Sequence, residues 1–67
     1  MKYKFTKEEA EAIRKLSIPF DPFSDLSEDQ EISLLEIVDE EAAKIGYDTI
    51  KGELYTDILD SMAKQAE

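Results

Sequence analysis

The chain has 67 residues, 17 acidic and eight basic, and its formal net charge at pH 7 is −9. A chain of this length has room for one small core and buries only about 60% of the surface that its unfolded form exposes. The absence of Cys and His excludes disulfides, thiolate metal sites and the commonest general base, and the negative charge disfavours nucleic acid and anionic membranes as partners.

The first elements in chain order are an extended arm and a short helix. Tyr3 and Phe5 alternate with lysines. Because a lone strand has nothing to pair with, we expect an extended N-terminal arm that lays both rings on the core. A capping box beginning at Thr6 opens a helix predicted over about residues 7–16, and the approach to Pro19 ends it.

A Pro/Phe-rich loop connects this helix to the second one. Residues 17–26 contain two prolines and four large apolar side chains, so we expect the loop to fold back over the core. A second capping box begins at Ser27, and apolar spacing predicts a helix over about residues 28–45 that ends at Gly46. Its apolar arc is wide enough for two neighbours, which predicts that this helix is central.

The third helix is predicted over about residues 49–65, with Gly52 costing its first turn up to ~1 kcal/mol relative to Ala. Three amphipathic helices with short connections predict an all-α fold, a small three-helix bundle formed by a single domain of residues 1–67. No stretch has the character of a signal peptide or of a membrane span. We therefore expect a cytoplasmic protein.

The negative charge is concentrated between Lys15 and Lys44, where nine acidic residues occur without a basic one. Two of the nine, Asp21 and Asp25, flank turns. Another three, Glu28, Asp29 and Glu31, occupy the first turn of the second helix, where the helix dipole stabilises them. The other four lie on later turns and form the candidate acidic interaction surface: Glu36, Asp39, Glu40 and Glu41. Like charges four residues apart, as at Glu36 and Glu40, cost ~0.2–0.5 kcal/mol, and only a Glu40–Lys44 pair offers local compensation. The alternative is a face that only keeps the protein soluble.

A second candidate surface is apolar. Ile37 lies at the edge of the apolar arc of the second helix, and with Phe20 and Phe23 it forms a candidate apolar interface. The alternative is that the loop closes over the bundle and buries all three side chains. In that arrangement we expect Phe20 or Phe23 to cover Ile32, which stands apart from the main arc.

The sequence offers no candidate catalytic, cofactor-binding or metal-ligating residues. Nucleophilic catalysis needs an activated side chain beside a base, and the available carboxylates are expected on solvated faces. Residues 21–32 imitate the alternation of a calcium loop, but Leu26 stands where that loop needs Gly and Ile32 where it needs Glu. We therefore expect no enzyme activity, no cofactor and no metal.

The function that the sequence favours is a non-catalytic interaction module that binds a basic protein partner through its acidic surface. DNA carries one charge per ~1.7 Å of duplex axis, and an acid-lined helix displays charge on a comparable scale. In this character, though in no motif, the chain resembles small acidic helical proteins that mimic DNA, and the resemblance implies an inhibitor of a DNA-binding protein.

The runner-up is a structural homodimer completed by the apolar patch, and a small carboxylate-based enzyme is third. We expect a monomer or homodimer without direct contact with nucleic acid or membrane.

Overall fold

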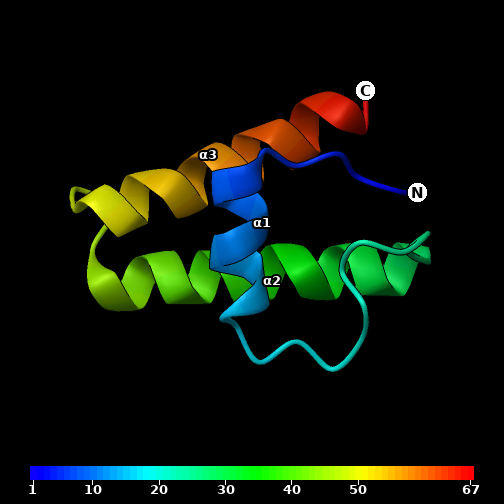
Figure 1. The fold of residues 1–67 in the computed structure, drawn as a ribbon, viewed down its shortest axis with the longest axis horizontal. Helices are drawn as coiled ribbons and strands as arrows, with labels where there is room; N and C mark the ends of the chain where they lie inside the picture. The colour runs from blue at the N-terminus through cyan, green and yellow to red at the C-terminus, as the bar shows by residue number, and fades with distance from the viewer.

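The computed structural model covers all 67 residues and contains three helices, α1 (Lys7–Arg14), α2 (Glu28–Ile45) and α3 (Ile50–Gln65). α2 and α3 form an antiparallel pair, and α1 runs across them at a steep angle (Figure 1). The predicted all-α three-helix bundle is confirmed, with α1 crossing the pair instead of lying along it. None of the helices combines the length and the apolar character that crossing a membrane requires.

The beginnings of α1 and α2 follow from local sequence. The Thr6 hydroxyl accepts from the backbone N–H of Glu9, and the Glu9 carboxylate accepts from the N–H of Thr6. Ser27 and Gln30 form the same reciprocal pair at α2. Both predicted capping boxes are therefore present, and each satisfies two backbone donors that a helix otherwise leaves free.

α1 ends two residues earlier than predicted. The N–H of Lys15 donates to the Ala12 carbonyl and that of Leu16 to the Ile13 carbonyl, so three-residue hydrogen bonds close the last turn. Such a tightened turn is a common way to end a helix. The chain then enters the loop that was predicted over residues 17–26, which contains Pro19.

The N-terminal arm ties the start of α2 to the end of α3. Met1 and Leu26 exchange backbone hydrogen bonds, and the Gln65 side chain both accepts from the N–H of Lys4 at 2.6 Å and donates to its carbonyl at 2.8 Å. The Asp25 carboxylate, 2.8 Å from the terminal ammonium, raises the pKa of the Met1 amino group, while the pKa of Asp25 itself is lowered.

Nine apolar side chains form the buried core, which draws on the arm, the loop and all three helices: Tyr3, Ile13, Leu26, Leu34, Val38, Ala42, Tyr55, Ile58 and Met62. Phe20 and Phe23 are half-buried against this core. The Phe23 ring meets Phe5 edge-on and lies under the guanidinium of Arg14, 5.1 Å from the ring centre. The loop therefore packs toward the arm and α1, and the expected cover over Ile32 is wrong, because Ile32 is 49% exposed.

The connection between α2 and α3 depends on two glycines. Gly46 has a φ of 91°, which side chains rarely tolerate. Gly52 is buried, and a Cβ there would lie 1.9 Å from the carbonyl oxygen of Gly46. The Thr49 hydroxyl closes the turn, because it donates to that carbonyl at 2.7 Å and accepts from the N–H of Gly52 at 3.0 Å. The start of α3 thus lies close against the backbone at the end of α2, and only Gly fits at position 52 without a shift.

Candidate functional site

The four acidic candidates of α2 do not share one face. Glu36, Asp39 and Glu40 are exposed, whereas Glu41 is half-buried and its carboxylate lies 3.5 Å from the Lys44 ammonium. Positions five apart on a helix point to different sides, so Glu41 stands away from Glu36. Lys44 pairs with Glu41 and not with Glu40, which corrects the local compensation expected from the sequence.

The charge of the other three acids is not neutralised within the chain. The contact between Lys44 and Glu41 is the only salt bridge that any of the eight Lys and Arg side chains forms. The remaining two salt bridges join the terminal ammonium to Asp25 and Glu31. Glu36, Asp39 and Glu40 therefore face solvent with no cationic group within 4.0 Å, and their field is available to a partner.

Tyr47 lies between the acidic side chains of α2 and those of α3. Its hydroxyl donates to the Asp39 carboxylate at 3.2 Å, and this hydrogen bond raises the pKa of Tyr47 above its ordinary value. The same tyrosine also lines an open hollow of about 310 Å³, and the other three lining residues, Glu53, Thr56 and Asp57, belong to α3. We call these four lining residues the Tyr47 hollow. The acids of the two helices thus meet on one side of the bundle.

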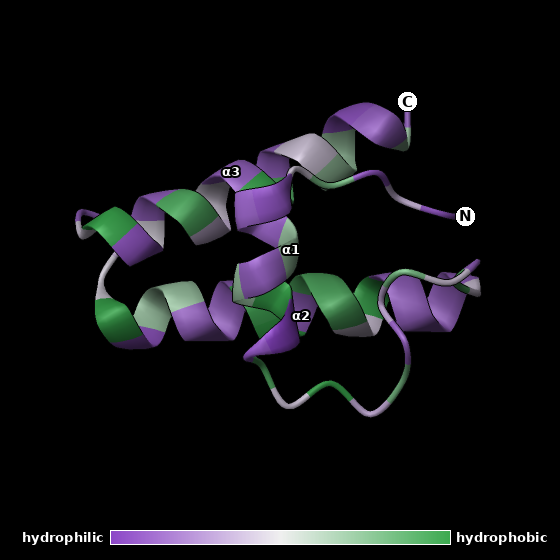
Figure 2. Ribbon diagram, viewed as in Figure 1, coloured by the Kyte–Doolittle hydropathy of each residue, from purple (hydrophilic) through white to green (hydrophobic).

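Three of the four exposed large apolar side chains lie around the α2–α3 connection, and the fourth is Ile32 on an early turn of α2. Ile50 is 89% exposed, Tyr47 53%, and Ile45, at the end of α2, 36%. Figure 2 shows hydrophobic colouring at the end of α2 and at the start of α3. Phe20, Phe23 and Ile37, the candidate apolar interface, are each half-buried. The structure therefore places the most exposed apolar side chains, Tyr47 and Ile50, outside the predicted apolar interface, and Tyr47 contacts Asp39 of the acidic surface.

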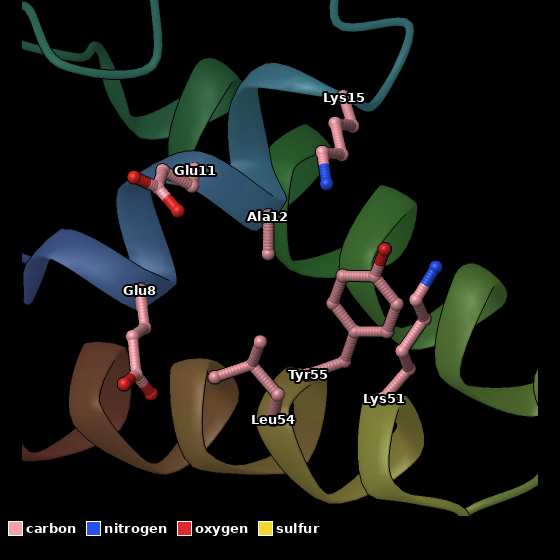
Figure 3. A pocket seen from close by; sticks show the side chains of 7 residues that line it. All are labelled: Glu8, Glu11, Ala12, Lys15, Lys51, Leu54 and Tyr55. Carbon is pink, nitrogen blue, oxygen red and sulfur yellow. The ribbon is translucent and has the colours of Figure 1, made fainter.

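A second hollow, of about 260 Å³, lies between α1 and α3 (Figure 3). Three of its lining residues are apolar and four are charged, with both signs present: Glu8, Glu11, Ala12, Lys15, Lys51, Leu54 and Tyr55. We call this set the α1–α3 hollow. None of the acidic or apolar candidates predicted from the sequence lines it.

Sequence reasoning missed the residues that join the helices. Tyr47 follows Gly46 in a short connection, and because connections run over the surface, this position was a signal for an exposed side chain. The pairing of Tyr47 with Asp39, eight residues earlier, depends on how the turn folds back. Glu53 and Asp57 carried no signal of their own, since acids on one face of α3 are equally typical of a solvated helix.

No group of three or more carboxylates in the chain is arranged to hold a metal ion. Comparisons with protein families, with curated proteins and with solved structures find no match for this chain. The chemistry available to the acidic side is the attraction of cationic groups and the acceptance of hydrogen bonds, with apolar contact at Tyr47 and Ile50 beside it.

Proposed function

We propose that this protein is a non-catalytic interaction module that binds a basic protein partner in the cytoplasm. The binding surface is the acidic side of α2, extended to α3 by the Tyr47 hollow. One observation carries the proposal: Glu36, Asp39 and Glu40 are exposed together, with no basic side chain of this chain near enough to pair with them. A surface of one sign speeds encounter with an oppositely charged partner and disfavours others.

The placement of these acids favours binding over simple solubility. Acids in the second half of a helix gain nothing from the helix dipole, and Glu36 and Glu40 repel each other at a spacing of four. The exposed side chains of Tyr47 and Ile50 add apolar contact next to the charge. Protein interfaces combine an apolar, aromatic-rich centre with a polar rim, and this end of the bundle has both parts. In a narrower form of the proposal, the partner is a DNA-binding protein and this chain is its inhibitor.

The homodimer has less support as a function. Phe20 and Phe23, which were expected to complete its interface, use part of their surface on the core of their own chain. A second copy would also bring the same charge of −9, so self-association works against electrostatic repulsion. A basic partner has no such cost.

The test compares two variants that each lose two negative charges. In Glu36→Gln/Glu40→Gln the charges come from the acidic side, and in the control, Glu28→Gln/Glu67→Gln, from elsewhere on the exposed surface. Each protein is immobilised and used to capture partners from lysate of the native host at about 50 and 150 mM salt, concentrations that span a large change in screening length. Circular dichroism verifies that each variant is folded.

We expect the wild type and the control to retain the same basic protein, and the acidic-side variant to retain at most about a tenth as much, which corresponds to ~1.4 kcal/mol. Retention by the wild type should fall at the higher salt concentration, because the attraction is screened. Equal retention by all three proteins, or retention that salt does not change, would contradict the proposal.

A further inference from the structure

The α1–α3 hollow lies on the side of α3 opposite the Tyr47 hollow. Along α3, Lys51, Leu54 and Tyr55 follow the spacing of three and four residues that places side chains on one helix face. Glu53, Thr56 and Asp57 share the other face. Binding of a basic protein through the acidic side therefore leaves the α1–α3 hollow unexplained.

The charges around the α1–α3 hollow are separated by sign. Lys15 and Lys51 lie on one side of it, and Glu8 and Glu11 lie on the other (Figure 3). None of the four forms a salt bridge, even though Glu11 and Lys15 have the four-residue spacing that favours one on a helix. The hollow thus has a cationic end and an anionic end, and both remain available to a ligand.

Tyr55 gives a second, independent indication of a ligand. The hydroxyls of Tyr3 and Tyr47 donate to carboxylates, at 3.3 and 3.2 Å, whereas that of Tyr55 has no partner in the protein. Tyr55 is only 8% exposed, but no unpaired polar side-chain atom of this chain is sealed from solvent, so the hydroxyl of this lining residue remains accessible. In Figure 3 this hydroxyl lies at the same end as the two lysine ammonium groups. A donor without a partner at a cationic end is suited to an anionic group.

We propose that the α1–α3 hollow binds a small zwitterionic molecule with an apolar body, of the chemical class of a dipeptide. The anionic end of the ligand lies between the ammonium groups of Lys15 and Lys51 and accepts from the Tyr55 hydroxyl. Its apolar body rests on Ala12 and Leu54, and its cationic end lies toward the two glutamates. The volume of about 260 Å³ is below the ~300–1,000 Å³ of clefts that hold drug-sized ligands, which fits a molecule of this size.

The probe for this site is leucyl-leucine, compared with its N-acetyl and its C-terminal amide derivatives. Each derivative removes one of the two charges and keeps the apolar body. In titrations followed by amide NMR shifts, we expect leucyl-leucine to bind with a Kd of about 1 mM and to move the signals of Ala12, Leu54 and Tyr55. Each derivative should bind about tenfold more weakly. No shift at about 10 mM leucyl-leucine, or equal binding of all three probes, would overturn the proposal.

Variants locate the site. Tyr55→Phe keeps the buried ring and removes only the hydroxyl, and it should weaken leucyl-leucine binding about fivefold to tenfold, while Tyr47→Phe leaves it unchanged. Lys15→Gln/Lys51→Gln should weaken binding at least about tenfold, and the charge-matched control Lys7→Gln/Lys64→Gln should not. Wild-type affinity in both Tyr55→Phe and the double lysine variant would overturn the proposal. If Tyr55→Phe fails to fold, the two lysine variants decide alone.

Discussion

The two hollows lie on either side of α3, have similar volumes and each contain a tyrosine, yet their chemistry differs. The Tyr47 hollow has two carboxylates and no base, and its tyrosine is held by Asp39 on α2. The α1–α3 hollow has two lysines, two glutamates and an apolar floor, and its tyrosine is unpaired. One surface attracts positive charge, and the other offers separate places for both signs.

This difference shows that a net charge of −9 does not describe a uniform surface. The bases of the chain are few, but Lys15 and Lys51 are far apart in sequence and are brought to one hollow because α1 crosses α3 (Figure 1). The acids of α2 and α3 are brought together on the opposite side by the turn at Tyr47. α3 is therefore the element that separates the two kinds of surface.

The largest effect on both hollows should come from Gly52→Ala. Gly52 stands between Lys51, which lines one hollow, and Glu53, which lines the other, and a Cβ there would lie 1.9 Å from the Gly46 carbonyl oxygen. Backbone cannot yield as a flexible side chain can, so we expect destabilisation by about 2–3 kcal/mol in urea unfolding. Binding at both hollows should weaken together.

The direction in which Gly52→Ala changes the stability serves as the control. Replacing Gly by Ala inside a helix ordinarily stabilises a protein by roughly 0.5–1 kcal/mol. A Gly52→Ala protein at least as stable as the wild type would show that the close approach of α3 to Gly46 does not hold the two surfaces in place.

A smaller effect is expected from Gln65→Ala, which tests whether the hollows depend on the far end of α3. The Gln65 side chain makes two hydrogen bonds to the backbone of Lys4, and both are solvent-exposed. Their loss should cost about 1 kcal/mol and speed amide exchange in the arm. Because no residue of either hollow lies beyond Asp57 on α3, binding at both should persist.

Lys64→Ala is the matched control, since Lys64 is exposed, is next to Gln65 and forms no salt bridge. Its stability should lie within ~0.5 kcal/mol of the wild type. If Gln65→Ala and Lys64→Ala unfold at the same urea concentration, the hydrogen bonds between Gln65 and Lys4 do not hold the arm. If Gln65→Ala also loses binding at either hollow, the first half of α3 is not independent of its end.

Features that depend on residues close together in the sequence could be predicted, and features that depend on tertiary contacts could not. The helix starts at Thr6 and Ser27 were predictable because capping boxes involve residues three apart, and the end of α2 followed from Gly46. The direction of the Phe23 ring, the exposure of Ile32 and the role of Gly52 depend on residues brought together only by the tertiary fold.

The candidate sites divide in the same way. The acids of α2 could be found from their spacing and from the absence of nearby bases, although the pairing of Glu41 with Lys44 removed one of them from the exposed face. The α1–α3 hollow could not be found, because its lysines come from two helices whose crossing no local pattern encodes. Sequence patterns therefore located a charged face but not a concave one.

The smallest expected effect concerns the tyrosine that joins the acids of α2 and α3. The hydrogen bond to Asp39 raises the pKa of Tyr47 above its ordinary value of 10, so Asp39→Asn should lower the Tyr47 pKa, measured by NMR of the ring carbons. A raised pKa means that the folded protein holds this proton more tightly than the unfolded chain. The stabilisation is therefore fully present below pH 10 and is lost as the pH rises through the pKa of Tyr47; in Asp39→Asn this pH dependence should be weaker.

Tyr3 is the internal control for this measurement. Its pKa is raised first by burial and only then by Glu31, so Glu31→Gln should leave the Tyr3 pKa above the ordinary value, and Asp39→Asn should not affect it. An unchanged Tyr47 pKa in Asp39→Asn would mean that the ring is not held against α2. The acids of α2 and α3 would then be two separate surfaces, and a basic partner bound by the first would gain nothing from Glu53 and Asp57.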